Sequence, residues 1–306
     1  MIVSVSGASG LIGRALCERL RERGDVVRRL VRGQTSGGDV RWDPGKHEID
    51  AAALEGTDVV VHLAGEPLAN GRWNAAKKRR IVESREQGTR LFAKALAEMT
   101  RPPRVFMSAS AIGIYGSRGD EVLSEASSPG TGFLADVCQR WESATEPAEK
   151  AGLRVVHLRI GLVLDPDGGA LKAMLPVFRF GLGGRLGSGQ QWMSWITLAD
   201  TIRAIERVME RSDVAGAVNV VGPAPVTNAE FTRALGRVLR RPVMLPAPRW
   251  ALRLAIGEMA DEAVLASGRA MPRKLQESGF VFSDSQLEAA LGAVLGRSRS
   301  DVRPRA

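Results

Sequence analysis

Short apolar runs alternate with amphipathic segments through the first half of the chain. Runs of the length and β-branched content of buried strands lie at residues 1–6, 26–31, 58–63, 104–107 and 154–160. Segments with apolar positions at helical spacing lie between them, at residues 11–23, 74–99 and 133–151. Strands that alternate with helices form a parallel sheet covered on both faces. The pattern therefore predicts an α/β fold with a doubly wound parallel sheet.

The alternation of strand and helix patterns ends after residue 163. Turn residues fill positions 165–169, and five glycines lie between Gly181 and Gly189. A strand at 218–221 is expected to return to the sheet, and helices at 228–240, 248–256 and 285–295 to form a smaller, mainly helical C-terminal domain that caps a substrate cleft. We expect a main domain of residues 1–165 completed by about 190–223, a smaller domain of 166–189 and 224–296, and a disordered tail at 297–306. The stretch 183–195 is either a lid, with Gln191 and Trp195 facing a substrate, or a hairpin.

A glycine-rich turn directly follows the first predicted strand. Gly7 permits the tight turn, Gly10 lets a pyrophosphate approach the backbone, and Gly13 lets the helix pack on the sheet. The free N–H groups of the helix N-terminus then face the anion. We interpret the turn as the start of a Rossmann domain that binds a dinucleotide, against the alternative of a purely structural β–α turn. The cofactor residues predicted here are Gly7, Ser9, Gly10, Leu11, Ile12 and Gly13.

The end of the second strand indicates which dinucleotide is bound. NAD-preferring domains usually carry a carboxylate there, which accepts hydrogen bonds from the ribose 2′-hydroxyl. This chain has Arg28-Arg29-Leu30-Val31-Arg32-Gly33 instead. Arg32, with Ser9, is suited to hold a 2′-phosphate, so we predict NADP(H) as the cofactor. The alternative is a solvated basic edge, which applies to at least one of the three arginines because Arg29 alternates with the other two across the strand.

The third strand ends in small residues and a carboxylate. Leu63, Ala64 and Gly65 are predicted to pass under the adenine side of the cofactor. His62 lies in an apolar run and is expected to be a core histidine. Glu66 follows at the carboxyl end of the strand, where such sheets place ligand chemistry, and is a candidate acid or base. The alternative is a loop carboxylate that caps a backbone group or pairs with a nearby arginine such as Arg72 or Arg85.

These residues, with Ser108-Ala109-Ser110 and Tyr115-Gly116, resemble the extended short-chain dehydrogenase/reductase superfamily, and most closely its atypical epimerase family proteins (NAD-dependent epimerase/dehydratase-like) with their own C-terminal domain. The resemblance covers the chain to about Leu295. Further stretches carry it: His62–Glu66, Ser84-Arg85 with Gly88-Thr89, Phe133–Ala135 through Trp141-Glu142, Leu158–Gly161, Ser194–Ile196 with Asp200, Asn219 with Pro223, Pro225–Asn228, Pro242, Gly257–Met259 and Gly279-Phe280.

The resemblance assigns further residues to the site. It implies that Ser108 and Ala109 lie beside the nicotinamide. It also implies that Ser110 lies near the position at which the superfamily has its substrate-polarising serine. It implies that Tyr115 lines the substrate cleft, the alternative being a packed loop aromatic with a hydrogen-bonded hydroxyl. Arg85 lies where the superfamily usually has an asparagine, and is expected to meet the pyrophosphate or an anionic substrate group.

One departure from the superfamily bears on catalysis. Working members use a Tyr-x-x-x-Lys pair, and the corresponding positions here hold Leu134 and Cys138. Neither side chain can replace a phenol and an ammonium group. Tyr115 is the only tyrosine of the chain. Two functions therefore stay open: an NADP(H)-dependent oxidoreductase or epimerase-like enzyme with an unorthodox acid, or a non-catalytic NADP(H)-binding sensor or structural protein.

The composition of the chain limits the classes of binding partner that we expect. The net charge of +9 is spread along the chain without a recognition motif, so we expect no nucleic-acid partner. No apolar run reaches the ~20 residues of a membrane span, and no signal-peptide pattern opens the chain, so we expect a cytoplasmic protein without a membrane partner. Cys17 and Cys138 offer neither a disulfide framework nor metal-ligand spacing. The expected partner is a small polar substrate, bound by a monomer or homodimer.

Overall fold

The computed structural model describes residues 1–296, so the predicted disordered tail lies outside the described residues. Its centre is an eight-stranded sheet in the order β12-β8-β6-β5-β1-β2-β3-β4, in which every neighbouring pair is parallel except β3 and β4. The strands are β1 (Ile2–Ser6), β2 (Val26–Val31), β3 (Val40–Asp43), β4 (Glu48–Ile49), β5 (Val59–His62), β6 (Val105–Ala111), β8 (Val155–Ile160) and β12 (Gly216–Val220). The predicted doubly wound α/β fold is confirmed.

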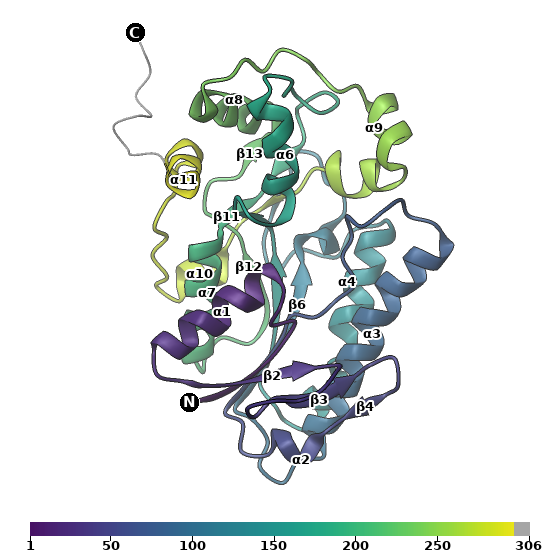
Figure 1. Cartoon of the computed structure of the whole chain (residues 1–306), viewed down its shortest axis with the longest axis vertical. Helices are drawn as coiled ribbons and strands as arrows, with labels where there is room; N and C mark the ends of the chain where they lie inside the picture. The colour runs from purple at the N-terminus through teal and green to yellow at the C-terminus, as the bar shows by residue number, and fades with distance from the viewer. Residues whose placement is uncertain (297–306) are drawn as a thin grey trace.

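Helices cover both faces of the sheet (Figure 1). On one face lie α1 (Leu11–Glu22) and α7 (Leu198–Glu210); on the other lie α3 (Ala75–Ala97), α4 (Phe133–Ser143) and α5 (Glu146–Lys150), with the short α2 (Ala51–Leu54) at one end. Successive side chains of a central strand point to opposite faces of the sheet, so each strand contributes to the hydrophobic core on both faces. Val59 and Val61 pack in the core of α1 and α7, whereas Val60 packs with Phe92 and Phe106 beneath α3.

The strand order reverses at β1. Its two neighbours are β2, which carries the chain outward to one edge, and β5, which leads to the other. Such a switch point opens a crevice at the carboxyl ends of the strands, where ligands bind in open α/β sheets. The glycine turn after β1 lies at this point.

Some elements differ from those predicted. The single helix expected at 133–151 is two helices, because α5 begins anew with Pro147 in its first turn, where the missing N–H of proline is tolerated. Strands β3 and β4 were not expected; they are short, and β4 adds an antiparallel edge. Helix α7 was also not expected, although its N-terminus is capped by Thr197.

The C-terminal part packs mainly as helices. A separate core around Phe231 joins α6 (Gly169–Arg179), α8 (Asn228–Leu239) and α11 (Leu287–Val294). Helix α9 (Arg249–Ile256) leads into a π-helical turn, η2 (Ala260–Val264), which reaches α4. Smaller elements complete the chain: η1 (Ile112–Tyr115), α10 (Arg273–Glu277), and the paired strands β7 (Val122–Leu123) with β14 (Arg269–Ala270), β9 (Leu162–Leu164) with β11 (Trp195–Thr197), and β10 (Trp192–Met193) with β13 (Val226–Thr227).

The stretch 183–195 forms neither a lid nor a hairpin of its own. The side chain of Gln191 is buried and donates to the carbonyl of Leu186 at 3.0 Å. Trp195 is 1% exposed, and its indole nitrogen donates to the carbonyl of Ala224 at 2.8 Å. Both side chains therefore serve the packing of this part and face no open cleft.

Candidate functional site

The glycine turn between β1 and α1 is built by close backbone contacts. Gly7 has φ +68°, and a Cβ there would lie 2.8 Å from the amide nitrogen of Ala64. A Cβ on Gly13 would lie 2.2 Å from the carbonyl oxygen of Gly7. Side chains are thus excluded where the turn presses on the end of β5 and where α1 packs on the turn. Ser9 and Gly10 stay exposed, and the N-terminus of α1 has no side-chain cap, which fits an anion on its free N–H groups.

A buried hydrogen bond between Ser6 and His62 holds the end of β5 against β1. Ser6 and His62 lie 2.6 Å apart (Oγ to Nδ1), and the same hydroxyl accepts from the amide of Leu63 at 3.2 Å. The His62 ring packs on Trp42 and Phe92, with centroids 5.5 and 4.8 Å away. Burial lowers the pKa of His62 to about 3, so the ring is neutral. His62 thus has the environment expected of a core histidine.

The three arginines of β2 and its end have different partners. Arg28 donates to two backbone carbonyls of the α2 region, at 2.9 and 3.1 Å. Arg29 forms an ion pair with Asp39, with two hydrogen bonds of 2.9 and 2.8 Å. Arg32 is exposed and has no hydrogen bond or ion pair within residues 1–296. It is therefore the arginine left available at the edge of the crevice.

Glu66 lies after β5 but is engaged by cations. Its Oε1 lies 2.8 Å from Nζ of Lys77 and 3.5 Å from Nε of Arg80. The hydrogen bond from Lys77, with help from Arg80, holds the pKa of the Glu66 carboxyl below its ordinary value. The carboxylate is therefore ionised at neutral pH. Glu66 is thus a loop carboxylate paired with nearby cations, as the alternative held, but the arginine is Arg80 and not Arg72 or Arg85. The cap at Asn74 sets Lys77 in the first turn of α3, beside the strand end.

Arg85 reaches the end of β5 from α3. One of its terminal nitrogens donates to the carbonyls of Glu66 and Ile81, at 3.1 and 3.2 Å. The guanidinium lies over the ring of Trp141, with 4.9 Å from its carbon to the ring centre. A Cβ on Gly65 would lie 3.2 Å from the same carbon, so the absence of a side chain at Gly65 leaves room for the arginine.

The candidates Ser110 and Tyr115 belong to one buried polar network. The Ser110 hydroxyl donates to Glu142 at 2.7 Å, and the Glu142 carboxylate accepts two bonds of 2.8 Å from Arg159. Arg159 also donates to the Tyr115 hydroxyl at 2.9 Å, and this hydroxyl donates to Asn219 at 2.7 Å. Burial raises the pKa of the Tyr115 phenol. The fully buried ring thus has the geometry of the packed aromatic, with its hydroxyl already occupied.

Leu134 and Cys138 occupy the positions of the missing tyrosine and lysine. Leu134 lies against Gly113, and Cys138 is 3% exposed. Burial, reinforced by Glu142, raises the pKa of the Cys138 thiol to about 11. The N-terminus of α4 is capped from η2, because Glu262 accepts from the amide of Leu134 at 3.1 Å. Cys138 is therefore a neutral thiol inside the helix packing.

Sequence reasoning missed several of these residues. Lys77 and Glu262 were not singled out as site residues, and Glu142, Arg159 and Asn219 entered only through the resemblance. A charged residue within the buried strand β8 was the available signal for Arg159, because a charge in such a position needs a partner.

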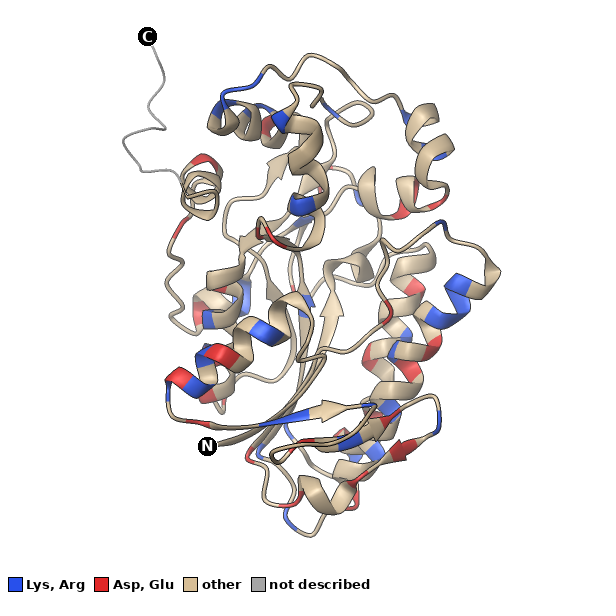
Figure 2. Ribbon diagram, in the orientation of Figure 1, with Lys and Arg blue, Asp and Glu red and all other residues tan. Residues whose placement is uncertain are grey.

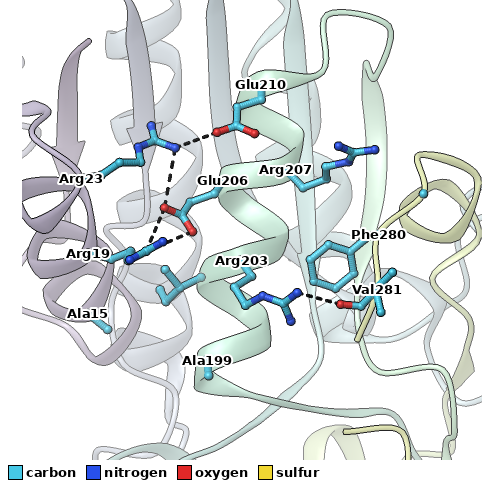
Figure 3. A pocket seen from close by; sticks show the side chains of 12 residues that line it. Ala15, Arg19, Arg23, Ala199, Arg203, Glu206, Arg207, Glu210, Phe280 and Val281 are labelled. Carbon is cyan, nitrogen blue, oxygen red and sulfur yellow. Dashed lines mark hydrogen bonds and ion pairs between the residues drawn. The ribbon is translucent and has the colours of Figure 1, made fainter. Parts of the chain in front are cut away.

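A groove of about 650 Å³ lies away from these residues, between α1, α7 and the segment 279–281 (Figure 3). There Arg19 and Arg23 of α1 converge on Glu206, the former at 3.2 Å. Arg203 reaches the carbonyl of Val281 at 2.9 Å. None of the predicted cofactor or catalytic residues lines this groove.

Charge is mixed over the surface. Lys, Arg and Glu side chains are interspersed along α1 and α3, apart from the basic run 77–80 in α3 (Figure 2). Within residues 1–296, no group of three or more His, Cys, Asp and Glu side chains is arranged to hold a metal ion. No helix among these residues has both the length and the apolar content needed to cross a bilayer.

A glycine turn at the switch point of a doubly wound sheet, with an uncapped helix N-terminus, defines a dinucleotide-binding protein of the Rossmann class. Residues 3–222 match the model of the NAD dependent epimerase/dehydratase family, and residues 247–294 match a domain of unknown function, DUF1731. The chain belongs to the NAD-dependent epimerase/dehydratase family.

Relatives match over almost the whole chain. Epimerase family protein Mb2239 of Mycobacterium bovis is 45% identical over 292 residues, 95% of this chain and 96% of that protein. Human epimerase family protein SDR39U1 is 33% identical over 299 residues, 96% of this chain and 100% of that protein. The predicted resemblance to epimerase family proteins is confirmed.

Solved structures agree with the fold. A crystal structure of human SDR39U1 (isoform 2) with NADPH has a TM-score of 0.89 and 32% identity, covering 97% of this chain and 99% of that chain. The nucleoside-diphosphate sugar epimerase of Corynebacterium glutamicum has a TM-score of 0.79 and 36% identity, covering 97% of this chain and 58% of that chain.

Proposed function

We propose that this protein binds NADP(H) and acts as an oxidoreductase or epimerase-like enzyme on a small polar substrate, without a Tyr–Lys pair. The observation that carries the cofactor choice is the state of Arg32. It is exposed and without a partner in the described chain, at the end of β2 beside the open glycine turn. Asp39, the carboxylate that follows β2, is bound by Arg29. The 2′-position of the cofactor would thus meet a cation and no free carboxylate.

A structural neighbour supports the same cofactor, because human SDR39U1 was crystallised with NADPH. In this chain the pyrophosphate would lie on the turn from Gly7 to Gly13, and the 2′-phosphate between Ser9 and Arg32. Leu63 to Gly65 and Ser108-Ala109 would line the remaining cofactor surface. The bound cofactor would supply hydride-transfer chemistry.

The candidate catalytic residues receive unequal support. Ser110 lies at the carboxyl end of β6, where a substrate hydroxyl or carbonyl would come, and its hydroxyl is oriented by Glu142. Glu66 is paired with Lys77 and the pKa of its carboxyl is lowered, so it is a weak base and is poorly suited to donate a proton at neutral pH. Tyr115 is fully buried and bound on both sides, which favours a role in holding Arg159 in place.

A non-catalytic NADP(H)-binding protein is the second candidate. The observation in its favour is the environment of Leu134 and Cys138, which packs both side chains and leaves no phenol or ammonium group in α4. Turnover separates the two candidates. Net oxidation of NADPH with a panel of carbonyl substrates is expected for a reductase, and conversion of a small polar substrate to its epimer without net oxidation of NADPH for an epimerase. The binding protein is expected to show neither.

Parallel titrations with NADPH and NADH test the cofactor assignment. We expect wild-type protein to prefer NADPH, and Arg32→Ala to weaken NADPH binding by about 10- to 100-fold while NADH binding changes little. Arg21→Ala is the control, because it removes one exposed positive charge from the last turn of α1, away from the glycine turn. Equal losses for both cofactors in Arg32→Ala would refute the 2′-phosphate contact. Failure of wild-type protein to bind either cofactor would refute the dinucleotide site.

A further inference from the structure

Arg85 is a partly buried cation, and most N–H donors of its guanidinium have no acceptor within residues 1–296. One terminal nitrogen donates to the carbonyls of Glu66 and Ile81. Within residues 1–296, neither the other terminal nitrogen nor Nε has a hydrogen bond. The guanidinium lies between the Trp141 ring and the exposed Gly65, at the carboxyl end of β5. The arginine therefore presents donors at the edge where ligands of such sheets bind.

Among residues 1–296, no carboxylate forms an ion pair with this guanidinium. Glu66 turns its carboxylate to Lys77 and Arg80, and offers Arg85 only its backbone carbonyl. On α4 the side chains nearest to Arg85 are neutral: the Trp141 ring and the Cys138 thiol, which burial keeps protonated. No Asp or Glu of residues 1–296 lies within 4.0 Å of the Arg85 nitrogens. Burial lowers the pKa of Arg85, as expected for a cation without a counterion.

Such an arrangement costs free energy in the unliganded protein. A buried charge is normally paired, so an unpaired one at the carboxyl edge of the sheet is a candidate for binding an anion. Arginine is suited to a planar anion, because its fork can donate two parallel hydrogen bonds to a carboxylate or a phosphate. An anionic group that enters beside Gly65 would satisfy both the charge and the free donors.

The sheet order separates this position from the pyrophosphate. The pyrophosphate is expected at the N-terminus of α1, directly after β1, whereas Arg85 meets the end of β5 and packs on α4. Strand β5 lies between β1 and β6, so Arg85 is displaced toward the strand that carries Ser110. Ser110 bonds to Glu142 and Arg85 packs on Trp141, so both side chains contact α4. The substrate is expected on this side, beside Ser110.

We propose that Arg85 binds an anionic group of the substrate, a carboxylate or a phosphate, while NADP(H) occupies the glycine turn. The proposal rests on the proposed function, because it requires the cofactor to lie along β1 and β5. It narrows the substrate from small and polar to small and anionic.

Binding of simple anions to the NADPH-saturated protein tests this. Inorganic phosphate and malonate are titrated separately by calorimetry, with sodium chloride used to match the ionic strength. We expect wild-type protein to bind at least one probe, and the preferred probe indicates the source of the anion. Arg85→Gln is expected to weaken this binding by about tenfold or more, and Arg85→Lys by less, because lysine keeps the charge but not the fork.

Arg80→Gln is the matched control. It removes the same charge from the same helix, but Arg80 is 57% exposed and points to Glu66. Its probe affinity is expected to stay within about threefold of wild type. Circular dichroism and thermal unfolding check that each variant folds. If Arg85→Gln does not fold, the probe affinity of Arg85→Lys alone tests the proposal. An affinity equal to that of wild type would then overturn it.

The outcomes separate this proposal from the proposed function. If Arg85→Gln loses NADPH affinity as strongly as probe affinity, Arg85 belongs to the cofactor site and the substrate assignment is wrong. If wild-type protein binds NADPH but neither probe, the anion site is wrong and the cofactor site stands. If wild-type protein does not bind NADPH, the proposed function fails first, and this proposal fails with it.

Discussion

Glu142 and Arg159 form two parallel hydrogen bonds of 2.8 Å each, between α4 and β8. Both side chains are largely buried, 12% and 8% exposed. The same guanidinium donates to Tyr115, which is bound in turn to Asn219 of β12. One ion pair therefore connects α4, two strands of the sheet and the turn that follows β6.

Removal of one partner from this pair is expected to destabilise the fold. Glu142→Gln keeps the shape but leaves Arg159 buried without a counterion, and we expect the free energy of unfolding to fall by about 3–5 kcal/mol. Urea denaturation measures this. The double variant Glu142→Gln/Arg159→Met is expected to recover part of the loss, because the buried charge is then gone. A single variant as stable as wild type would mean that the pair is not held in solution.

The stability of the protein is expected to fall on mild acidification because of His62. Burial lowers the pKa of His62 from 6.5 to about 3, so protons bind preferentially to the unfolded chain below pH 6.5. This contribution to stability is present above the unfolded pKa and is lost as the pH falls toward the folded pKa. Between pH 7 and pH 5 it corresponds to about 2 kcal/mol.

The comparison of wild type with His62→Asn isolates this effect, since asparagine does not titrate. The variant should lose less unfolding free energy between pH 7 and pH 5 than wild type does. His157, whose pKa burial also lowers, contributes with the same sign in both proteins. His47→Asn is the control, because His47 is exposed and its φ of 55° suits asparagine. Equal slopes for wild type and His62→Asn would contradict the prediction.

Gly13→Ala is expected to disturb the cofactor turn. The new Cβ would lie 2.2 Å from the carbonyl oxygen of Gly7, a contact with backbone that no rotamer can relieve. We expect a loss of about 1–3 kcal/mol in unfolding free energy and a clear loss of NADPH affinity. Gly268→Ala is the control, because no heavy atom lies within 4 Å of its Cβ position. Unchanged NADPH affinity in Gly13→Ala would place the cofactor elsewhere.

Restoring the missing lysine is expected to fail. Cys138→Lys would bury a second cation beside Arg85, and we expect a loss of about 3 kcal/mol or more in unfolding free energy. Leu134→Tyr/Cys138→Lys should therefore show no oxidoreductase activity. Cys138→Ala tests the size change alone and should cost less. A stable Cys138→Lys protein would show that the site accommodates an ammonium group.

The sequence was sufficient to predict what depends on local pattern. The turn from Gly7 to Gly13 was predicted because each glycine answers a backbone requirement within one βα unit, and the strands were predicted from their apolar runs. The partners of charged residues were harder to predict from the sequence. Glu66 pairs with Lys77 because the cap at Asn74 fixes where α3 begins, and such a detail decides among several nearby cations.

Contacts between distant segments could not be predicted from pattern. Tyr115 and Asn219 are 104 residues apart, and Arg159 is 44 residues from Tyr115, so only the completed sheet brings them together. The break between α4 and α5 was missed for a different reason. Pro147 was compatible with the amphipathic spacing of the long helix, and its position in the first turn of a new helix is a matter of packing.

The place of β12 in the chain has a consequence for synthesis on the ribosome. Strand β8 pairs with β6 on one side and with β12 on the other, and β12 begins only at Gly216. While the segment between them emerges, the outer edge of β8 lacks its partner and Val156 and Leu158 lack the neighbours Val218 and Val220 of the same core. An open edge of this kind can pair with other chains. The nascent protein thus carries an open sheet edge in that interval, which a chaperone would protect from pairing with other chains.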